Sequence, residues 1–349
     1  MSKKVIWRGL LGLLVLLLIL GAFLAHRYYN YIFSDNIALS AESCELYIYP
    51  NSSFGDLLDS LHTMSCIESE ESFLWTAERM EFTSAKLRPG RYVIQQPMNN
   101  REFIQRLRSG NQDAINLVVP AARDLTVVAA RAGNTLMPDS ALFADFFLGI
   151  ELEEKFELDA RQLKSRIIPN TYQMWWNSDP DDLVARLLRE YELFWDKNQR
   201  REKADKIGLS TEEVIILASI VERESNYVPE LPTIAGVYLN RLQSNWPLQA
   251  DPTVVFALGN PEIRRVLTRD LEIDSPYNTY KYPGLPPGPI CIPSIHSIDA
   301  VLNPASHEYF FFCAKPDNSG AHVFSKTLSA HMQNARRFQN WLNQQRIMR

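Results

Sequence analysis

An uninterrupted apolar run close to the N-terminus limits what this chain can fold into more than any other feature. Residues 9–25 read GLLGLLVLLLILGAFLA, and counted from Val5 the segment has 21 residues with Arg8 as its one charged side chain. A helix of this length crosses about 30 Å of hydrocarbon if Arg8 reaches back to the headgroups. We therefore expect residues 1–27 to form a short cytoplasmic tip and a single N-terminal transmembrane helix.

A cleaved signal peptide is the main alternative for this segment. The run is longer than the apolar core of a usual signal peptide. Ala25 is the one small residue after which cleavage is plausible, but the -3 position, where a signal peptide has a second small residue, is then Phe23. No cysteine lies near its end, which argues against a lipoprotein anchor. Lys3, Lys4 and Arg8 precede the run, and the positive-inside rule then places the N-terminus in the cytoplasm and the remaining residues outside it.

Composition excludes several classes of protein. The 36 basic and 41 acidic residues give a net charge of -5, which argues against a nucleic-acid partner because phosphate binding needs a basic surface. The six histidines show no metal-ligand spacing, so we expect no metal and no cofactor. Four cysteines form two loose pairs without a CxxC motif; we expect buried thiols, and the sequence leaves disulfide formation open. They are Cys44, Cys66, Cys291 and Cys313.

Residues 28–118 have the pattern of a small α+β module. Residues 45–49 alternate as a strand does, and Ser53 with Asp56 predicts a capping box at the start of a helix. A strand after Pro89 and a helix ending at Gly110 follow. The segment LRPGRYVIQQPMNNREFIQRLRSG resembles the LysM-like module that bacterial wall enzymes carry near the membrane. A spacer that only holds the next domain off the membrane is the alternative.

Residues 119–349 predict a larger α+β domain. Longer amphipathic helices appear, and residues 306–326 contain two apolar runs joined by PDNSG, which is typical of a hairpin before a closing helix. One helix begins with a capping box at Ser210 and Glu213 and is almost wholly apolar from 214 to 221. It carries the sequence SIVERES at its end, with two carboxylates, Glu222 and Glu224.

Helical periodicity separates these two carboxylates. At 100° per residue, Glu224 extends the apolar stripe of Leu217, Ile220 and Val221, whereas Glu222 points to nearly the opposite side. A carboxyl at the mouth of an apolar pocket has a raised pKa and can act as a general acid, as in glycoside cleavage. The alternative is that both glutamates are ordinary salt-bridge partners of arginine side chains.

Polar and aromatic residues on rigid loops follow this helix. Asn240, Arg241, Gln249 and Asp251 surround a bend with two prolines, and residues 277–280 precede four more prolines. Amides, hydroxyls and aromatic faces suit an uncharged sugar, which offers hydroxyl edges and apolar ring faces. For any single residue, turn formation is the alternative.

Six separated motifs resemble those of the endolytic murein transglycosylase family, also called YceG-like. They are LASIVERES, NRL, LQADPTVVFALG, SPYNTYKYPGLPPGPI, LNPA and AHVFS. The resemblance implies a single-pass protein of the bacterial plasma membrane with an extracytoplasmic catalytic domain. It implies that Glu224, the second glutamate of the S-[IV]-[IV]-E-[KR]-E motif, cleaves the MurNAc-GlcNAc β-1,4 bond of nascent peptidoglycan, forming 1,6-anhydro ends and limiting strand length.

The resemblance also completes the candidate site. It implies glycan strands as substrate and peptidoglycan synthases as membrane partners. We expect Glu224 to be catalytic and Glu222 and Arg241 to support it. The candidate substrate-binding residues are Ser225, Asn240, Gln249, Asp251, Tyr277, Asn278, Thr279, Tyr280 and His322.

Some positions depart from the family pattern. Ala250 replaces a usual Thr, KSRIIPNTY replaces E-G-x-L-F-P-D-T-Y, and VPAARDLTVVAA lacks the usual Glu-Gly. Two other functions remain open: a catalytically silent wall-binding scaffold, and a hydrolytic muramidase with Asp251 as second carboxylate.

Overall fold

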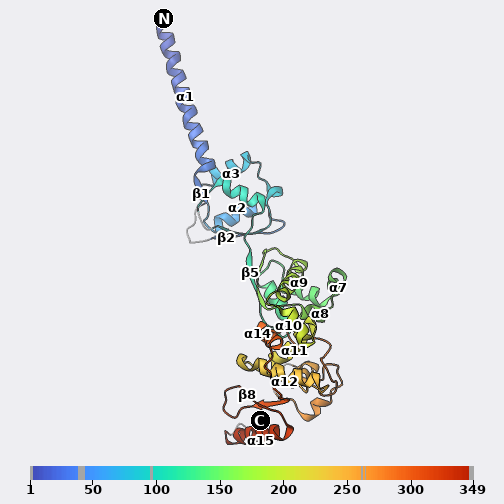
Figure 1. Cartoon of the computed structure of the whole chain (residues 1–349). Helices are drawn as coiled ribbons and strands as arrows, with labels where there is room; N and C mark the ends of the chain where they lie inside the picture. The colour runs from blue at the N-terminus through green and yellow to red at the C-terminus, as the bar shows by residue number, and fades with distance from the viewer. Residues whose placement is uncertain (1–2, 38–43, 95–96, 261, 264, 346–349) are drawn as a thin grey trace. The chain divides into compact units, whose positions relative to one another are not determined.

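The computed structural model describes residues 3–37, 44–94, 97–260, 262–263 and 265–345 (Figure 1). The chain divides into two compact units. The first comprises residues 1–115 with 173–177, and the second comprises 116–172 with 178–349. The expected boundary lies after residue 118, and residues 173–177, which the sequence places in the second domain, belong to the first unit.

The N-terminal helix α1 (Lys3–Phe33) is long and apolar enough from Trp7 to Phe33 to cross a membrane. Its apolar side chains are exposed, and only its last turns pack against α3 and α4 (Figure 1). There Tyr28 stacks on Trp75 with ring centres 4.6 Å apart. The single apolar N-terminal helix is confirmed, and it continues beyond residue 27, the expected end of the anchor, to Phe33.

The first unit also contains two short antiparallel sheets and three helices. Its expected caps are present: Ser53 and Asp56 form the capping box of α2, and Gly110 ends α4 with a left-handed φ of 72°. Leu46, Phe73 and Tyr92 lie in its core. The mixed α+β architecture is confirmed, whereas the LysM-like identity of the module stays a prediction. The elements are β1 (Asp35–Ile37) paired with β4 (Met98–Asn99), β2 (Cys44–Ile48) paired with β3 (Gly90–Ile94), α2 (Phe54–Thr63), α3 (Glu70–Arg79) and α4 (Asn100–Ser109).

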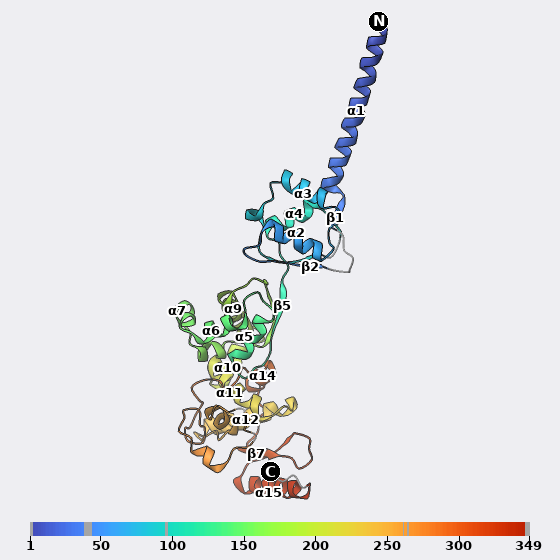
Figure 2. The same cartoon turned by 180° about the vertical axis from the view of Figure 1, so that it is seen from behind.

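Helices dominate the second unit. Its first helices, α5 and α6, pack side by side (Figure 2). In chain order the helices are α5 (Leu125–Gly133), α6 (Ser140–Leu148), α7 (Ile150–Phe156), α8 (Ala160–Ser165), α9 (Pro180–Asp196), α10 (Arg200–Ile207), α11 (Thr211–Glu224), α12 (Leu231–Gln243), α13 (Asp251–Ala257), α14 (Ile295–Leu302) and α15 (Leu328–Gln344). The strands are β5 (Ile115–Val119), β6 (Asn170–Met174), β7 (Phe311–Ala314) and β8 (His322–Ser325).

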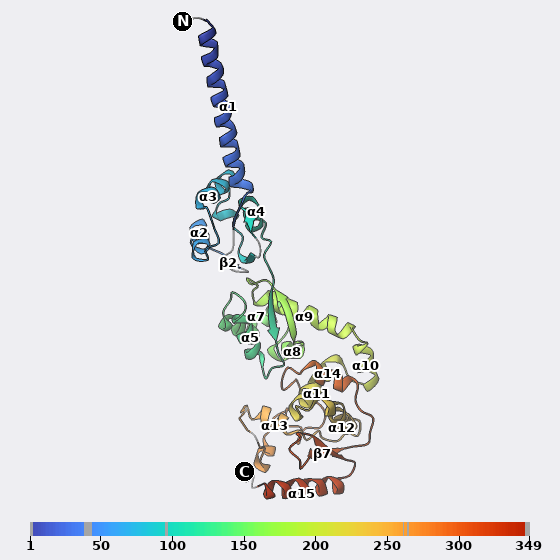
Figure 3. The same cartoon turned by 90° about the vertical axis from the view of Figure 1, so that its left-hand side faces the viewer.

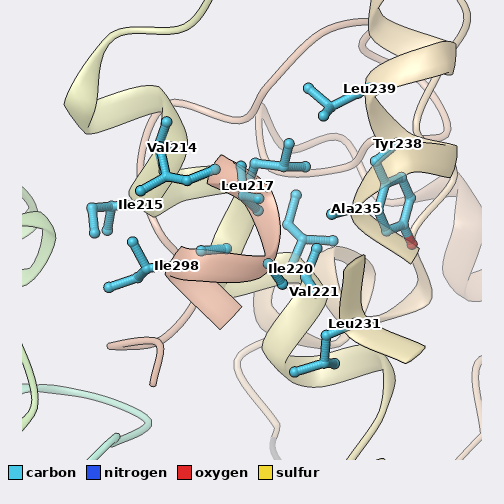
Figure 4. Close-up of a cluster of buried hydrophobic side chains, with 14 of the residues drawn as sticks. Val214, Ile215, Leu217, Ile220, Val221, Leu231, Ala235, Tyr238, Leu239 and Ile298 are labelled. Carbon is cyan, nitrogen blue, oxygen red and sulfur yellow. The ribbon is translucent and has the colours of Figure 1, made fainter. Parts of the chain in front are cut away.

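Helix α11 forms the centre of this unit. Ser210 and Glu213 form the expected capping box, and every residue from Val214 to Val221 is buried. Helices α12 and α14 pack against it, as Figure 4 shows for the aliphatic side chains around Leu217 and Ile220. Full burial of one such side chain contributes about 1.5–3 kcal/mol. The end of α11 is therefore held in place by a core that resists displacement.

The expected hairpin and closing helix are confirmed. β7 and β8 pair antiparallel with Phe312 opposite Phe324, and the turn between them contains Asn318 and Gly320 at positive φ. Helix α15 packs along this hairpin (Figure 3). The hairpin and α15 together form one wall of the cavity described below.

Candidate active site

The last residue of α11, Glu224, lines a cavity of about 470 Å³ in the second unit. Helices α11 and α12, the loops on either side of α13, the hairpin and α15 all contribute to its walls. The lining residues are Glu224, Tyr238, Arg241, Gln249, Asp251, Tyr280, Phe311, Phe312, Cys313, Ala314, His322, Leu328, His331 and Met332.

Burial controls the protonation of Glu224. Loss of hydration raises the pKa of this carboxyl to about 7, and the negative charge of Asp251 acts in the same direction. A hydrogen bond from Tyr238 and the positive charge of Arg241 oppose the rise. Near neutral pH the protonated and ionised forms are both populated, as a group that must give and take a proton requires.

Tyr238 is the direct partner of Glu224. Its Oη donates to Glu224 Oε1 at 2.5 Å, and burial raises the pKa of the phenol, which keeps it a donor. Figure 4 shows the ring among the aliphatic side chains of the α11 core, with the hydroxyl end turned away from them. Tyr238 is not among the residues expected from the sequence, although it lies three residues before Arg241 and so on the same face of a helix.

Glu222 lies on the other side of α11, as helical periodicity predicts. Its Oε2 accepts hydrogen bonds from the hydroxyls of Ser294 and Ser297, both at 2.6 Å. Ser294 is the N-cap of α14, so Glu222 joins the end of α11 to the start of that helix. The two carboxylates therefore do not share a site.

Arg241 lines the cavity and is almost fully buried. Its Nε donates to the carbonyl of Phe310 at 2.8 Å and its Nη1 to the carbonyl of Leu248 at 2.5 Å. Its guanidinium lies 5.5 Å from the ring centre of Phe311. Burial lowers the pKa of Arg241, but the group stays charged at neutral pH. Arg241 thus supplies a fixed positive charge and connects three segments of the cavity wall.

Gln249 before α13, Asp251 at the start of α13 and Tyr280 in a later loop line a polar part of the cavity. Tyr280 Oη donates to Asp251 Oδ1 at 2.5 Å. Gln249 has a left-handed φ of 50°, uncommon for a residue with a side chain, and such strain persists where neighbouring contacts enforce it. Here the Gln249 amide donates to the carbonyl of Thr279 at 3.1 Å. Asp251, Tyr280 and Gln249 therefore lie together with Glu224, as expected.

Other expected binding residues lie away from the cavity. Asn240 donates to the carbonyls of His307 and Tyr309, and Asn278, fully buried, donates to two carbonyls of its own loop. Tyr277 packs on Phe256 with ring centres 4.7 Å apart. Asn278 holds its own loop, which is the turn-forming alternative that the sequence left open, whereas Asn240 joins α12 to the segment before β7.

Thr279 and Ala250 explain one departure from the family pattern. The Thr279 hydroxyl accepts from the Ala250 amide at 3.0 Å and lies 2.9 Å from the hydroxyl of Thr253. Ala250 itself is buried. The two threonines therefore hold the loop beside Asp251 without a hydroxyl at position 250.

Glu230, a buried carboxylate that is not among the expected site residues, bonds both Ser225 and His322, and His322 lines the cavity. Glu230 Oε1 accepts from the hydroxyl of Ser225 at 2.6 Å and lies 2.7 Å from Nδ1 of His322. Glu230 Oε2 accepts from the His322 amide at 2.9 Å. Because Ser225 follows Glu224 directly, this carboxylate connects the end of α11 to β8. Glu230 follows a proline in a segment that the sequence predicts to be an exposed loop, so nothing in the sequence indicates that this side chain is buried.

Replacing Glu230 tests this connection. In Glu230→Ala the partly buried Ser225 hydroxyl and His322 imidazole lose their acceptor, and an unsatisfied buried group costs about 1–3 kcal/mol, which is an upper limit for each of these two groups. We expect a lower melting temperature and a roughly tenfold loss of activity on glycan, measured by calorimetry and product release. Glu308→Ala is the matched control, because Glu308 is an exposed carboxylate paired with Lys326 at the surface. Equal behaviour of the two variants would contradict this role of Glu230.

In the described part of the chain, no group of three or more His, Cys, Asp or Glu side chains is arranged to hold a metal ion. The cavity instead combines one carboxyl with a raised pKa, a second carboxylate, a buried cation and aromatic faces. A profile of the YceG-like family matches residues 46–337, which run from β2 to α15. The chain belongs to the YceG-like family.

Relatives of this YceG-like chain carry an activity in their names. A Bacillus subtilis protein named endolytic murein transglycosylase is 30% identical over 311 residues, covering 84% of each chain. A Streptococcus pneumoniae protein of the same name is 25% identical over 324 residues, covering 82% of this chain and 57% of that one. A solved YceG-like protein from Listeria monocytogenes is 27% identical, with a TM-score of 0.50 over 84% of this chain and 98% of that chain.

Proposed function

We propose that this protein is a membrane-anchored lytic transglycosylase that cleaves the MurNAc-GlcNAc β-1,4 bond of nascent peptidoglycan. The observation that carries the proposal is Glu224, a carboxyl with a pKa of about 7 that lines an aromatic and polar cavity and accepts a hydrogen bond from Tyr238. The names of the Bacillus and Streptococcus relatives support the same reaction class.

The reaction needs a single carboxyl. Protonated Glu224 donates its proton to the glycosidic oxygen, and the bond to the muramyl anomeric carbon breaks. The Glu224 carboxylate, stabilised by Tyr238 and Arg241, then takes the proton from the muramyl C6 hydroxyl, whose oxygen attacks the anomeric carbon. The product is a 1,6-anhydro end, and Glu224 is protonated again. The C6 oxygen and the anomeric carbon that it attacks belong to the same sugar, so this oxygen takes the place of water as the nucleophile.

Product analysis tests the proposal. Mass spectrometry of glycan digested by the purified full chain should reveal 1,6-anhydroMurNAc ends, which are one water lighter than reducing ends. Asp251 lines the same cavity, and a hydrolytic muramidase using it as second carboxylate is the second candidate. Reducing ends would favour the muramidase. Binding of glycan without any cleavage would favour the non-catalytic scaffold.

The pH dependence of this reaction follows from Glu224. The free enzyme must hold the proton before the first step, and the pKa of Glu224 is about 7. We therefore expect kcat/KM to fall about tenfold per pH unit above about pH 7. Tyr238→Phe removes a donor that lowers this pKa, so its descending limb should move to higher pH. Initial rates of anhydro-end release between about pH 5 and 9 give the pH profiles of the wild type and of Tyr238→Phe. A descending limb at the same pH in both proteins would contradict the assignment of this limb to Glu224.

The proposal includes location and cellular role. Helix α1 is a candidate anchor, and its orientation with Lys3 and Lys4 in the cytoplasm would hold the catalytic unit outside, where glycan strands emerge beside their synthases. Cuts there would limit strand length. Alkaline phosphatase fused after Arg349 should be active in cells. An inactive phosphatase fusion would overturn this topology. In a separate test of the anchor, deletion of residues 1–27 should release the protein from the membrane pellet.

A further inference from the structure

A second cavity of about 240 Å³ lies beside the end of α11 and along α13. Arg223 lines it, while the next residue, Glu224, lines the first cavity. In the same way Asp251 faces the first cavity, and Val255 and Phe256 face the second. The two cavities thus lie in one unit and share two helices.

A buried lysine, which has no carboxylate partner among the described residues, lies against Phe256 in the wall of the second cavity. Lys164, in α8, is 8% exposed, and its Nζ lies 4.7 Å from the ring centre of Phe256. No ion pair joins it to an acidic side chain in the ranges that the structure describes. Burial lowers its pKa, with Cys291 and Asp124, two lining residues, acting in the opposite direction. Burying a cation without an anion costs free energy, which a bound anion would offset.

Positive charge exceeds negative charge around this cavity. Arg123 pairs with Asp124 at 2.7 Å, and Asp124 also accepts from the Thr126 amide as the N-cap of α5. Neither Arg223 nor Lys164 is in an ion pair within the described residues. Apolar side chains of α13, together with Ile290, form much of the remaining wall. The cavity therefore suits a group that combines a carboxylate with small apolar substituents.

We propose that the second cavity binds the peptide stem of the muramyl residue, with Lys164 and Arg223 contacting its carboxylates. This inference rests on the proposed function, because a glycan strand in the first cavity carries short peptides that begin at a lactyl group and contain alanine methyls and free carboxylates. A strand lying over the end of α11 would place a stem beside Arg223. Lys164 stands where the family usually has Glu, so this stem contact would distinguish the chain from relatives that keep the acid.

Direct binding tests the proposal without reference to catalysis. The probe is N-acetyl-L-Ala-γ-D-Glu, titrated by calorimetry into the full chain in detergent. We expect Lys164→Met and Arg223→Gln each to weaken binding at least about tenfold, and Lys197→Met, at an exposed position, to leave it unchanged. The diamide of the probe should not bind. Equal affinity of all variants, or displacement of the probe by inorganic phosphate at the same concentration, would overturn the assignment.

Cleavage gives a second measure. The wild type should cut stem-bearing strands about tenfold faster than strands stripped by an amidase, and in Lys164→Met this ratio should fall toward one. A ratio unchanged in the variant would overturn the proposal. Failure of the proposed function differs from failure of the stem proposal. In the first case neither strand is cut but the dipeptide still binds.

A separate observation concerns two thiols in the first unit. Cys44, at the start of β2, and Cys66, after α2, have their Sγ atoms 2.8 Å apart. Cys66 is buried and Cys44 partly so. Cys291 and Cys313 are not brought together: the first lies against the carbonyl of Ser219, and the second lines the first cavity.

We infer that Cys44 and Cys66 form a disulfide in the exported protein, an inference that rests on the proposed extracytoplasmic location. Disulfide exchange with an exported dithiol oxidase balances the step: the two cysteines lose two protons and two electrons, their sulfurs join, and the disulfide of the oxidase becomes a dithiol. Burial, followed by the neighbouring Cys66 thiol, raises the pKa of Cys44, so few thiolates exist in the folded unit and the exchange belongs to the folding stage.

Thiol counting by mass spectrometry tests the inference on the full chain purified from membranes. After alkylation in denaturant without reduction, we expect two of the four cysteines to be blocked. Cys44→Ala should free Cys66, whereas Cys291→Ala should leave the blocked pair unchanged. Four alkylated cysteines in the wild type would overturn the inference. The result does not depend on catalysis, and an active phosphatase fusion shows separately that the unit is exported.

Discussion

Glu224→Gln is expected to abolish release of anhydro ends, with kcat lowered by about 10³-fold or more. The amide has no proton to donate and cannot accept one, and a positioned acid or base accounts for about 10²–10⁴-fold in each role. The fold should be retained, because a Gln carbonyl can still accept the hydrogen bond of Tyr238. Mass spectrometry of digested glycan measures the effect, and binding of the strand to the variant should persist.

Glu222→Gln is the matched control, since it alters a carboxylate two residues away that bonds Ser294 and Ser297 instead of lining the cavity. It should lower stability and leave at least a tenth of the activity. Complete inactivity of a folded Glu222→Gln, or substantial activity of Glu224→Gln, would contradict the assignment of Glu224.

The same substitution of Glu224 should stabilise the protein at alkaline pH. The pKa of Glu224 is near 4.5 in an unfolded chain and about 7 in the folded one, so the folded state binds the proton more tightly. This contribution to stability is complete below about pH 4.5 and disappears as pH rises through about 7, with an upper limit on the order of 3 kcal/mol. Glu224→Gln should therefore melt several degrees above the wild type at about pH 8 and close to it at about pH 4.5, measured by calorimetry.

Sequence periodicity was enough to place the two carboxylates on different sides of α11. Residues 214–221 are uniformly apolar apart from Ser219, which predicts burial, and helical geometry then assigns Glu222 and Glu224 to different sides whatever surrounds them. Caps at Ser53 and Ser210 were predictable for the same reason: their hydrogen bonds join residues three apart. Local physics determines these features.

Contacts between distant segments were not predictable in this way. Glu230 meets His322 across 92 residues, and Asn240 meets a carbonyl 67 residues away. A polar residue that binds sugar and one that binds a remote carbonyl have the same sequence signature, because amides suit both partners. Asn240 in α12 and Asn278 in its loop have the chemistry of sugar-binding residues, but the folded chain uses their amides to bind its own backbone carbonyls.

Arg241→Met is expected to have the largest effect on stability. The change leaves the carbonyls of Phe310 and Leu248 without their donor inside the protein, at about 1–3 kcal/mol each, although Met fills much of the volume. The free energy of unfolding in guanidinium should fall by about 2–4 kcal/mol with an unchanged m-value. Removing the positive charge also raises the pKa of Glu224, so the descending limb of kcat/KM should move to higher pH.

Arg241→Lys separates the two roles of this side chain. Lysine keeps the charge but lacks the planar fork that reaches two carbonyls at once. The stability of Arg241→Lys should fall between those of Arg241→Met and the wild type, while its pH limb should stay near the wild-type position. Because a packing defect alone lowers stability without moving a pH limb, a limb that shifts equally in both variants would show that the charge of Arg241 does not act on Glu224.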